Sequence, residues 1–191
     1  MKILLIDNAS KYLDKIQKLV GLDNDFEIVN FKNLTSYLIS KNYDLIILSG
    51  GKPAKLGLNE KTKQELNELE QQLIRETKSP VIGICYGFRM IAEAYGSKLE
   101  YQEAVIKGIK LIRLIGNFWR LDISKQIPCY EEHHYTCKRL SSELIPLATS
   151  SRGIEIFKHK KKKIFGFQFH PEVDTEHQYG DEIFKYILKG I

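Results

Sequence analysis

The sequence has little cysteine and no long apolar run. Its 191 residues include three cysteines, Cys85, Cys129 and Cys137. That number is too small, and odd, for a disulfide framework, so reduced thiols are expected. No apolar stretch approaches the roughly 18 residues of a membrane span, and the opening run MKILLI stops at Asp7, short of a secretory signal. The sequence therefore predicts a cytoplasmic protein with no membrane segment.

The sequence also lacks a broad excess of either charge. Lysines and arginines number 29 against 24 acidic residues, for a net charge of +5. Five of the lysines fall within residues 158–163, and without them the two signs are equal at 24. A basic face for nucleic acid is therefore not expected. We expect the lysine run to cap a hairpin in solvent, with docking to an acidic partner or an RNA as the alternative.

Short apolar runs alternate with helical periodicity in the first half of the chain. The predicted strands are residues 2–6, 26–31, 44–48 and 80–84, and the predicted helices are 9–20, 34–40, 60–77 and 86–95. This alternation predicts an α/β fold with a central, mostly parallel sheet covered by helices on both faces. Residues 98–168 predict an antiparallel extension, followed by a helix at 181–189. With no repeat or linker, residues 1–191 are expected to form a single domain.

A cysteine stands at a predicted corner between a buried strand and a helix, in GICYG at residues 83–87. The flanking Gly83 and Gly87 suit a sharp, strained turn that presents the Cys85 side chain at the carboxyl end of the sheet. The helix N-terminus there favours an anion, and so a thiolate. A small buried hydrophobe is the competing interpretation of Cys85, and the corner alone leaves the two evenly balanced.

A histidine and a carboxylate follow the last predicted strand, in FQFHPE at residues 167–172. Pro171 ends strand pairing, so His170 and Glu172 are expected just beyond the sheet edge. The carboxylate can accept from one ring nitrogen and leave the other to act on a thiol. A lone histidine is more often structural, but its presence together with the cysteine corner favours a catalytic pair.

Two glycines, Gly50 and Gly51, follow the predicted strand 44–48. Glycine lets backbone N–H groups approach a ligand closely, as an oxyanion hole requires. Taken alone, a plain tight turn is the better interpretation.

These motifs together resemble the class I glutamine amidotransferases. IDN, SGG, GICYG and FQFHPEV occur in the family's order and spacing, over nearly the whole chain. The opening ILLIDNASKY and the tail HPEVDTEHQYGDEIFKYI are most similar to the free-standing glutaminase subunit of archaeal-type GMP synthetase, with the anthranilate synthase glutaminase more distant. The resemblance implies a flavodoxin-like fold.

The resemblance also implies roles for individual residues. Cys85 would attack the side-chain amide of glutamine, backbone N–H groups of Gly51 and Tyr86 would hold the oxyanion, and His170, oriented by Glu172, would protonate the departing ammonia. A substrate-binding role would fall to Gly50, Arg89 and His133. The chain would hold no metal or cofactor. Ammonia would pass to a synthetase partner of the ATP pyrophosphatase type, which would carry ATP and magnesium; a Gly-rich loop ending in Lys-Ser/Thr is absent here.

The sequence departs from the family pattern near the expected substrate pocket. Arg89 stands where the family usually has glutamine, and it could reach the substrate's α-carboxylate, select another acid or block the pocket. The family's Ser-His-x-Asp aligns with residues 132–135, which keep His133 but neither the serine nor the aspartate. Lys52 follows SGG, where proline is usual. These changes affect the expected specificity and leave the nucleophilic chemistry intact.

Four potential zinc ligands lie close together in the sequence: Cys129, His133, His134 and Cys137. Thiolate and imidazole suit zinc. The paired spacings of zinc sites are absent, however, and the family alignment gives His133 another role, so a zinc site is not favoured.

Two further functions compete with the glutaminase. One is a γ-glutamyl hydrolase or related amidase, with Arg89 recognising a different substrate. The other is a degenerate, non-catalytic subunit that binds and regulates a partner.

Overall fold

The computed structural model describes residues 1–116, 126–174 and 179–191. Its described strands form one nine-stranded sheet in the order β2-β1-β3-β4-β9-β8-β7-β5-β6. Five strands are parallel: β1 (Lys2–Asp7), β2 (Asp25–Asn30), β3 (Leu45–Leu48), β4 (Val81–Ile84) and β9 (Ile164–Phe167). Their order, with β1 between β2 and β3, is the flavodoxin-like arrangement.

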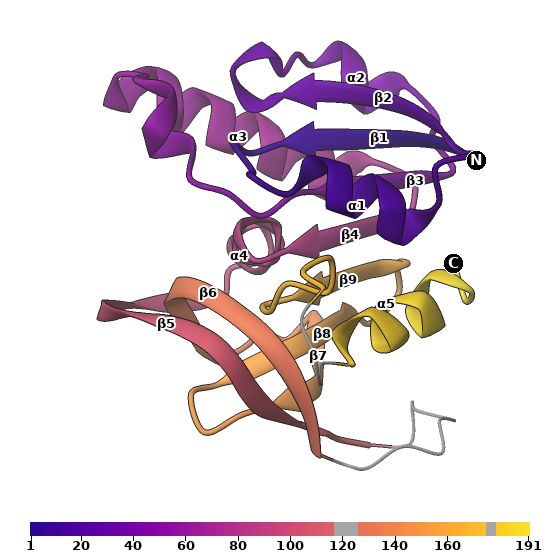
Figure 1. The fold of residues 1–191 in the computed structure, drawn as a ribbon. Helices are drawn as coiled ribbons and strands as arrows, with labels where there is room; N and C mark the ends of the chain where they lie inside the picture. The colour runs from indigo at the N-terminus through magenta and orange to yellow at the C-terminus, as the bar shows by residue number, and fades with distance from the viewer. Residues whose placement is uncertain (117–125, 175–178) are drawn as a thin grey trace.

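The other strands extend this sheet in antiparallel fashion. They are β5 (Lys98–Leu114), β6 (Gln126–Arg139), β7 (Leu144–Thr149) and β8 (Ile154–His159). The long β5–β6 pair forms the edge of the sheet farthest from β2 (Figure 1). The predicted antiparallel extension is therefore confirmed.

Helices cover both faces of the parallel part. One layer contains α1 (Leu13–Val20) and α5 (Gly180–Leu188), and the other contains α2 (Tyr37–Ser40), α3 (Glu60–Glu76) and α4 (Tyr86–Ala94) (Figure 1). Side chains alternate between the layers: on β1, Ile3 and Leu5 face α1 and α5, whereas Leu4 and Ile6 face the other three helices. Both layers are apolar, so the parallel strands are apolar on both faces. The predicted fold class is confirmed. Among the described helices, none is long and apolar enough to cross a membrane.

Two predicted helices are shorter than their sequence pattern suggested. The helix expected at 9–20 begins at Leu13, because Ala9 has a positive φ of 61° and the Ser10 N–H donates to Asp7 Oδ1 in a turn. The helix expected at 34–40 is a single turn from Tyr37, since Leu34 is extended after the 3-10 helix η1 (Phe31–Asn33). A second 3-10 helix, η2 (Pro53–Leu56), follows β3.

The lysine run lies in the turn between β8 and β9, as predicted. The His159 ring accepts hydrogen bonds from the backbone N–H groups of Lys161 and Lys162. The Lys162 side chain donates to the carbonyl of Arg75 in the last turn of α3, and Lys163 donates to the carbonyl of Ile191. Lys162 thus contacts the end of α3 and Lys163 contacts Ile191, which supports the structural interpretation of the run.

Candidate active site

The candidate residues meet at the carboxyl edge of the parallel strands. β1, β3, β4 and β9 run side by side and in the same direction, so their carboxyl ends share one edge. The segments that follow them contain Asn8, Gly50, Cys85 and His170 in turn. In open α/β sheets this edge is where ligands bind.

Cys85 adopts the strained corner that the sequence predicted. It lies between β4 and α4 with φ 51° and ψ −93°, a conformation that non-glycine residues rarely adopt. Its N–H donates to the Phe167 carbonyl on β9 at 2.7 Å. A Cβ on Gly83 would lie 2.5 Å from backbone atoms of Gly87, and one on Gly87 would lie 2.3 Å from the Leu48 carbonyl oxygen. Both glycines are therefore required by close backbone packing.

His170 and Glu172 form a buried pair beside this corner. His170 Nδ1 is 2.8 Å from Glu172 Oε1, and the two side chains are 5% and 0% exposed. The His170 N–H donates to the Tyr130 carbonyl on β6, which fixes the backbone position. The ring therefore has one nitrogen held by the carboxylate and the other available on the Cys85 side.

Charge around the His170 ring favours its protonated form. Burial alone would lower the pKa of His170, but the negative charges of a Cys85 thiolate and of Glu172, and hydrogen bonds to both, raise it well above its ordinary value. This is the electrostatic pattern of a thiolate–imidazolium pair. This charge interaction links Cys85 and His170 as one functional unit.

The glycine loop after β3 lies against this pair. A Cβ on Gly50 would lie 2.9 Å from His170 Cε1 and 3.3 Å from Cys85 Cβ. Gly51 has φ 155°, and a Cβ there would lie 1.9 Å from the Asn8 carbonyl oxygen. The Tyr86 N–H is at the first position of α4, where helical geometry leaves it without an intrahelical partner. The loop and the helix start thus converge where an oxyanion hole was predicted.

A buried polar network supports the glycine loop from behind. Asn8 donates from its backbone to Ser49 Oγ at 2.9 Å and from its side chain to Glu70 Oε1 at 3.0 Å. Burial raises the pKa of Glu70, on α3, to about 7, while the hydrogen bond from Asn8 opposes that rise. A carboxyl group inside the protein is therefore part of the loop's support.

Cys85 opens onto two adjoining cavities. A cavity of about 340 Å³ is lined by Tyr86 and Arg89 of α4, by residues 51–54, and by residues 132–135 of β6. A smaller one of about 100 Å³ is lined by Tyr12, Gly50 and His170. The larger volume suits a small-molecule ligand.

Arg89 lies along the wall of the larger cavity. Its Nε is 2.8 Å from Glu93 Oε1, and its guanidinium carbon is 4.1 Å from the Tyr135 ring centroid. The cavity remains open with the side chain held in this way. Of the three roles considered for Arg89, blocking the pocket is thus the one that the geometry disfavours.

His133 also lines the larger cavity, but its ring is engaged within the protein. Nδ1 is 2.8 Å from the Tyr135 carbonyl oxygen, and Nε2 is 3.3 Å from Glu131 Oε2. Its predicted contact with substrate remains a prediction.

The four potential zinc ligands do not form one site. They lie along β6, where eight residues of extended strand separate Cys129 from Cys137 by about 26 Å at ~3.3 Å per residue, and the two cysteines pack in different core layers. No single ion can bind both. The structure instead groups His133 with Glu131 and with Glu155 of β8, and burial together with Glu131 raises the pKa of Glu155 to about 8.

Three buried carboxylates were not predicted from the sequence: Glu70, Glu131 and Glu155. Two had a signal. Glu131 lies two residues from Cys129 and from His133, and so shares their strand face, and Glu155 interrupts the apolar run GIEIF. Glu70 lies in a polar helix, and nothing in the sequence around it indicates that it is buried.

The strand order, the cysteine corner and the histidine–carboxylate pair define an α/β protein with a candidate cysteine–histidine site at its sheet edge. The family model for glutamine amidotransferase class-I matches residues 4–189, and the chain belongs to this family. It is 34% identical over 199 residues to one subunit of a glutamine-hydrolyzing GMP synthase of Methanococcus vannielii, covering 98% of this chain and 95% of the relative. The corresponding protein of Picrophilus torridus is 33% identical, with 99% and 98% covered.

Solved structures agree with this assignment. A protein of Thermoplasma acidophilum that is named for the same GMP synthase subunit superposes with a TM-score of 0.81 at 25% identity, covering 99% of this chain and 92% of that one. A glutamine amidotransferase of Thermotoga maritima superposes with a TM-score of 0.71 at 20% identity, covering 100% and 84%, and this second likeness concerns the fold.

Proposed function

We propose that this chain is a glutaminase subunit that hydrolyses glutamine to glutamate and ammonia and supplies the ammonia to a separate synthetase, in GMP synthesis. The observation that carries the proposal is Cys85 at a strained corner beside the buried His170–Glu172 pair, open to a cavity of about 340 Å³. The 33–34% identity to GMP synthase subunits over nearly the full chain supports the choice of pathway.

The proposed chemistry proceeds in two steps. The Cys85 thiolate attacks the side-chain carbonyl carbon of glutamine, and backbone N–H groups of Gly51 and Tyr86 hold the resulting oxyanion. His170 donates its proton to the amide nitrogen as the carbon–nitrogen bond breaks, releasing ammonia and leaving a glutamyl thioester. A water that gives a proton to His170 then attacks the thioester, releasing glutamate and restoring the thiolate. Glu172 keeps the ring oriented throughout.

The proposed glutaminase makes ammonia, and the separate synthetase uses it. Neither proposed step uses a cofactor on this chain; ATP and magnesium belong to a synthetase of the ATP pyrophosphatase type. We place the protein in the cytoplasm, where free thiols such as its three cysteines stay reduced.

The proposal is tested by incubating the purified chain, alone and with a cognate synthetase, with glutamine and measuring glutamate. We expect Cys85→Ser to reduce the rate by at least about 10³-fold, as loss of a catalytic nucleophile does. A glutamine-analogue diazoketone should label the wild type and the matched variant Cys137→Ser, whose thiol is buried, but not Cys85→Ser. An unlabelled wild type with no glutamate release in either setting would favour the non-catalytic subunit instead.

A further inference from the structure

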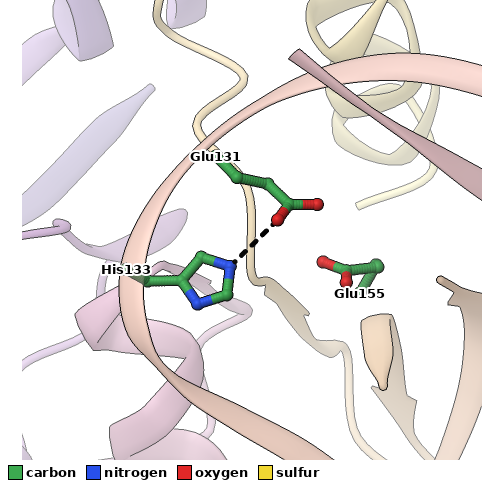
Figure 2. Close-up of side chains that lie close together, drawn as sticks. All are labelled: Glu131, His133 and Glu155. Atoms are coloured by element: carbon green, nitrogen blue, oxygen red, sulfur yellow. Dashed lines mark hydrogen bonds and ion pairs between the residues drawn. The ribbon is translucent and has the colours of Figure 1, made fainter. Parts of the chain in front are cut away.

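Three buried ligating side chains gather outside the proposed catalytic unit. Glu131 and His133 lie two residues apart on β6 and so share one face, and Glu155 lies on β8 opposite them (Figure 2). The residues are 0%, 5% and 1% exposed, and one ligand atom from each lies within 4.8 Å of the other two. The cluster therefore places two carboxyl groups and an imidazole together, away from solvent.

Two carboxylate oxygens in this cluster have no hydrogen-bond partner among the described residues. Glu155 Oε1 accepts from Ser150 Oγ at 2.6 Å, but Glu155 Oε2 and Glu131 Oε1 are unpartnered. The Glu155 carboxyl group points toward the other two side chains (Figure 2). Buried polar atoms in folded proteins are almost always satisfied, so these two oxygens call for a bound cation or a shared proton.

The hydrogen bond of His133 Nδ1 is the one that a metal-bound histidine makes. Nδ1 lies 2.8 Å from the Tyr135 carbonyl oxygen, which can only accept, so Nδ1 carries a proton. In the neutral ring, Nε2 then directs a lone pair toward Glu131 Oε2, 3.3 Å away. Two facing electron pairs repel unless a metal ion or a proton lies between them, and a proton there would make His133 and Glu131 an ion pair. Histidines that bind metals characteristically donate the second N–H to a backbone carbonyl in this manner.

We propose that Glu131, His133 and Glu155 bind one divalent transition-metal ion of the zinc class. Zinc takes imidazole nitrogen and carboxylate oxygen at about 2.0–2.2 Å, and ligand atoms within 4.8 Å of one another reach that geometry by small side-chain movements. Magnesium and calcium prefer all-oxygen sites, so the imidazole disfavours them. Of the three residues, His133 lines the larger cavity.

Such an ion would also position the proposed catalytic groups. Between the two β6 ligands, the Glu132 carbonyl oxygen lies 3.7 Å from Cys85 Sγ. On the other side, the Glu155 carbonyl accepts from the N–H of Gln168, in the segment that leads to His170. The ion would thus link β6, whose Glu132 carbonyl contacts the thiol, to β8, whose Glu155 carbonyl contacts Gln168. The binding itself does not depend on the glutaminase proposal.

The test is metal binding by the full-length chain after removal of bound metal with a chelator. We expect Zn²⁺ to bind with one equivalent per chain by calorimetry, and Co²⁺ to give visible absorption bands of a nitrogen–oxygen site. The isosteric variants Glu131→Gln and Glu155→Gln should each weaken Zn²⁺ binding by at least about 100-fold, since each removes a direct ligand. Glu143→Gln is the matched control, because Glu143 also pairs with a histidine, His159, at 3.6 Å but on the surface; it should bind Zn²⁺ like the wild type.

Several outcomes would overturn the proposal. The first is absence of saturable Zn²⁺ binding to the wild type. The second is a Zn²⁺ affinity in both glutamine variants equal to that of the wild type, and the third is Mg²⁺ binding as strong as Zn²⁺ binding. A cluster that instead shares a proton would show metal-independent melting, with the glutamine variants more stable than the wild type at neutral pH. If one variant fails to fold, the other variant and the Co²⁺ spectrum of the wild type still decide the question. None of these readouts uses glutaminase activity, so failure here is distinct from failure of the proposed function.

Discussion

At the scale of single residues, His170 joins the two halves of the proposed catalytic unit. Its backbone is fixed by β6, one ring nitrogen is fixed by Glu172, and its charge is coupled to Cys85. The sequence already predicted these partners from a corner cysteine and a two-residue His–Glu spacing. It could not predict burial of the pair, because the His170 ring packs against Tyr12 and Tyr130, which are distant in the sequence.

Glu172→Gln should shift the pH profile of glutaminase activity. The carboxylate is one of the charges that raise the pKa of His170, so its removal lowers that pKa and the imidazolium is lost at lower pH. We expect the alkaline limb of kcat/KM against pH to move to lower pH and the maximal rate to fall on the order of 10²-fold. The exposed Glu182→Gln on α5 is the control. An unmoved limb would show that Glu172 does not act through His170.

Arg89→Gln tests the most marked departure from the family pattern. The guanidinium lines the larger cavity with its Nε bound to Glu93, leaving the other N–H groups for a substrate carboxylate. Loss of one charge-assisted hydrogen bond, about 1.5 kcal/mol, should reduce kcat/KM for glutamine by about tenfold. Arg89→Lys, which keeps the charge, should lose less. A gain in glutamine use by Arg89→Gln would instead favour the hydrolase of altered specificity.

At the scale of elements, sequence periodicity located the parallel strands and most helices but misjudged two helix starts. Apolar residues at helical spacing include Tyr12 and Leu34, so the pattern alone starts both helices too early. Local backbone conformation delays the two starts: Ala9 has a positive φ and Leu34 is extended. The antiparallel half was predicted as a class, but not its strand order, because pairing of β5 with β7 depends on contacts between residues more than 30 apart.

Gly50→Ala tests how closely the loop after β3 is fitted to the histidine. The added methyl group would lie 2.9 Å from His170 Cε1, so the ring must move by a few tenths of an ångström away from its place beside Cys85. Misplacement of catalytic groups by up to 1 Å costs up to roughly 10²-fold in rate, and we expect a fall of about that size in kcat. The thermal midpoint should change little. Gly190→Ala, at the end of α5 with ordinary contacts, is the control, and an active Gly50→Ala enzyme would contradict the proposed fit.

At the scale of the whole molecule, one sheet runs through both halves of the chain. β4 of the first half pairs with β9 of the second, and β9 pairs with β8 of the antiparallel part. The single domain predicted for residues 1–191 stays a prediction, which a single cooperative unfolding transition would support. The site depends on this continuity, since Cys85 and His170 follow the neighbouring strands β4 and β9.

The buried carboxyl group of Glu70 should make global stability depend on pH. Its pKa is about 7 in the folded protein against 4.5 for the ordinary group, so the folded state retains a proton that the unfolded chain releases. Stability contributed by this group is therefore full below about pH 4.5 and is lost as the pH rises to about 7. The loss amounts to about 3 kcal/mol at 1.36 kcal/mol per pH unit.

Glu70→Gln removes this titration and keeps an oxygen to accept from Asn8. The variant should be more stable than the wild type by about 3 kcal/mol at pH 8 and by much less at pH 5, measured by urea unfolding at both pH values. The exposed Glu68→Gln on the same helix should show no such difference. If the advantage of Glu70→Gln were the same at pH 5 and pH 8, proton binding by Glu70 would not be the cause, and the network behind the glycine loop would hold an ionised carboxylate throughout.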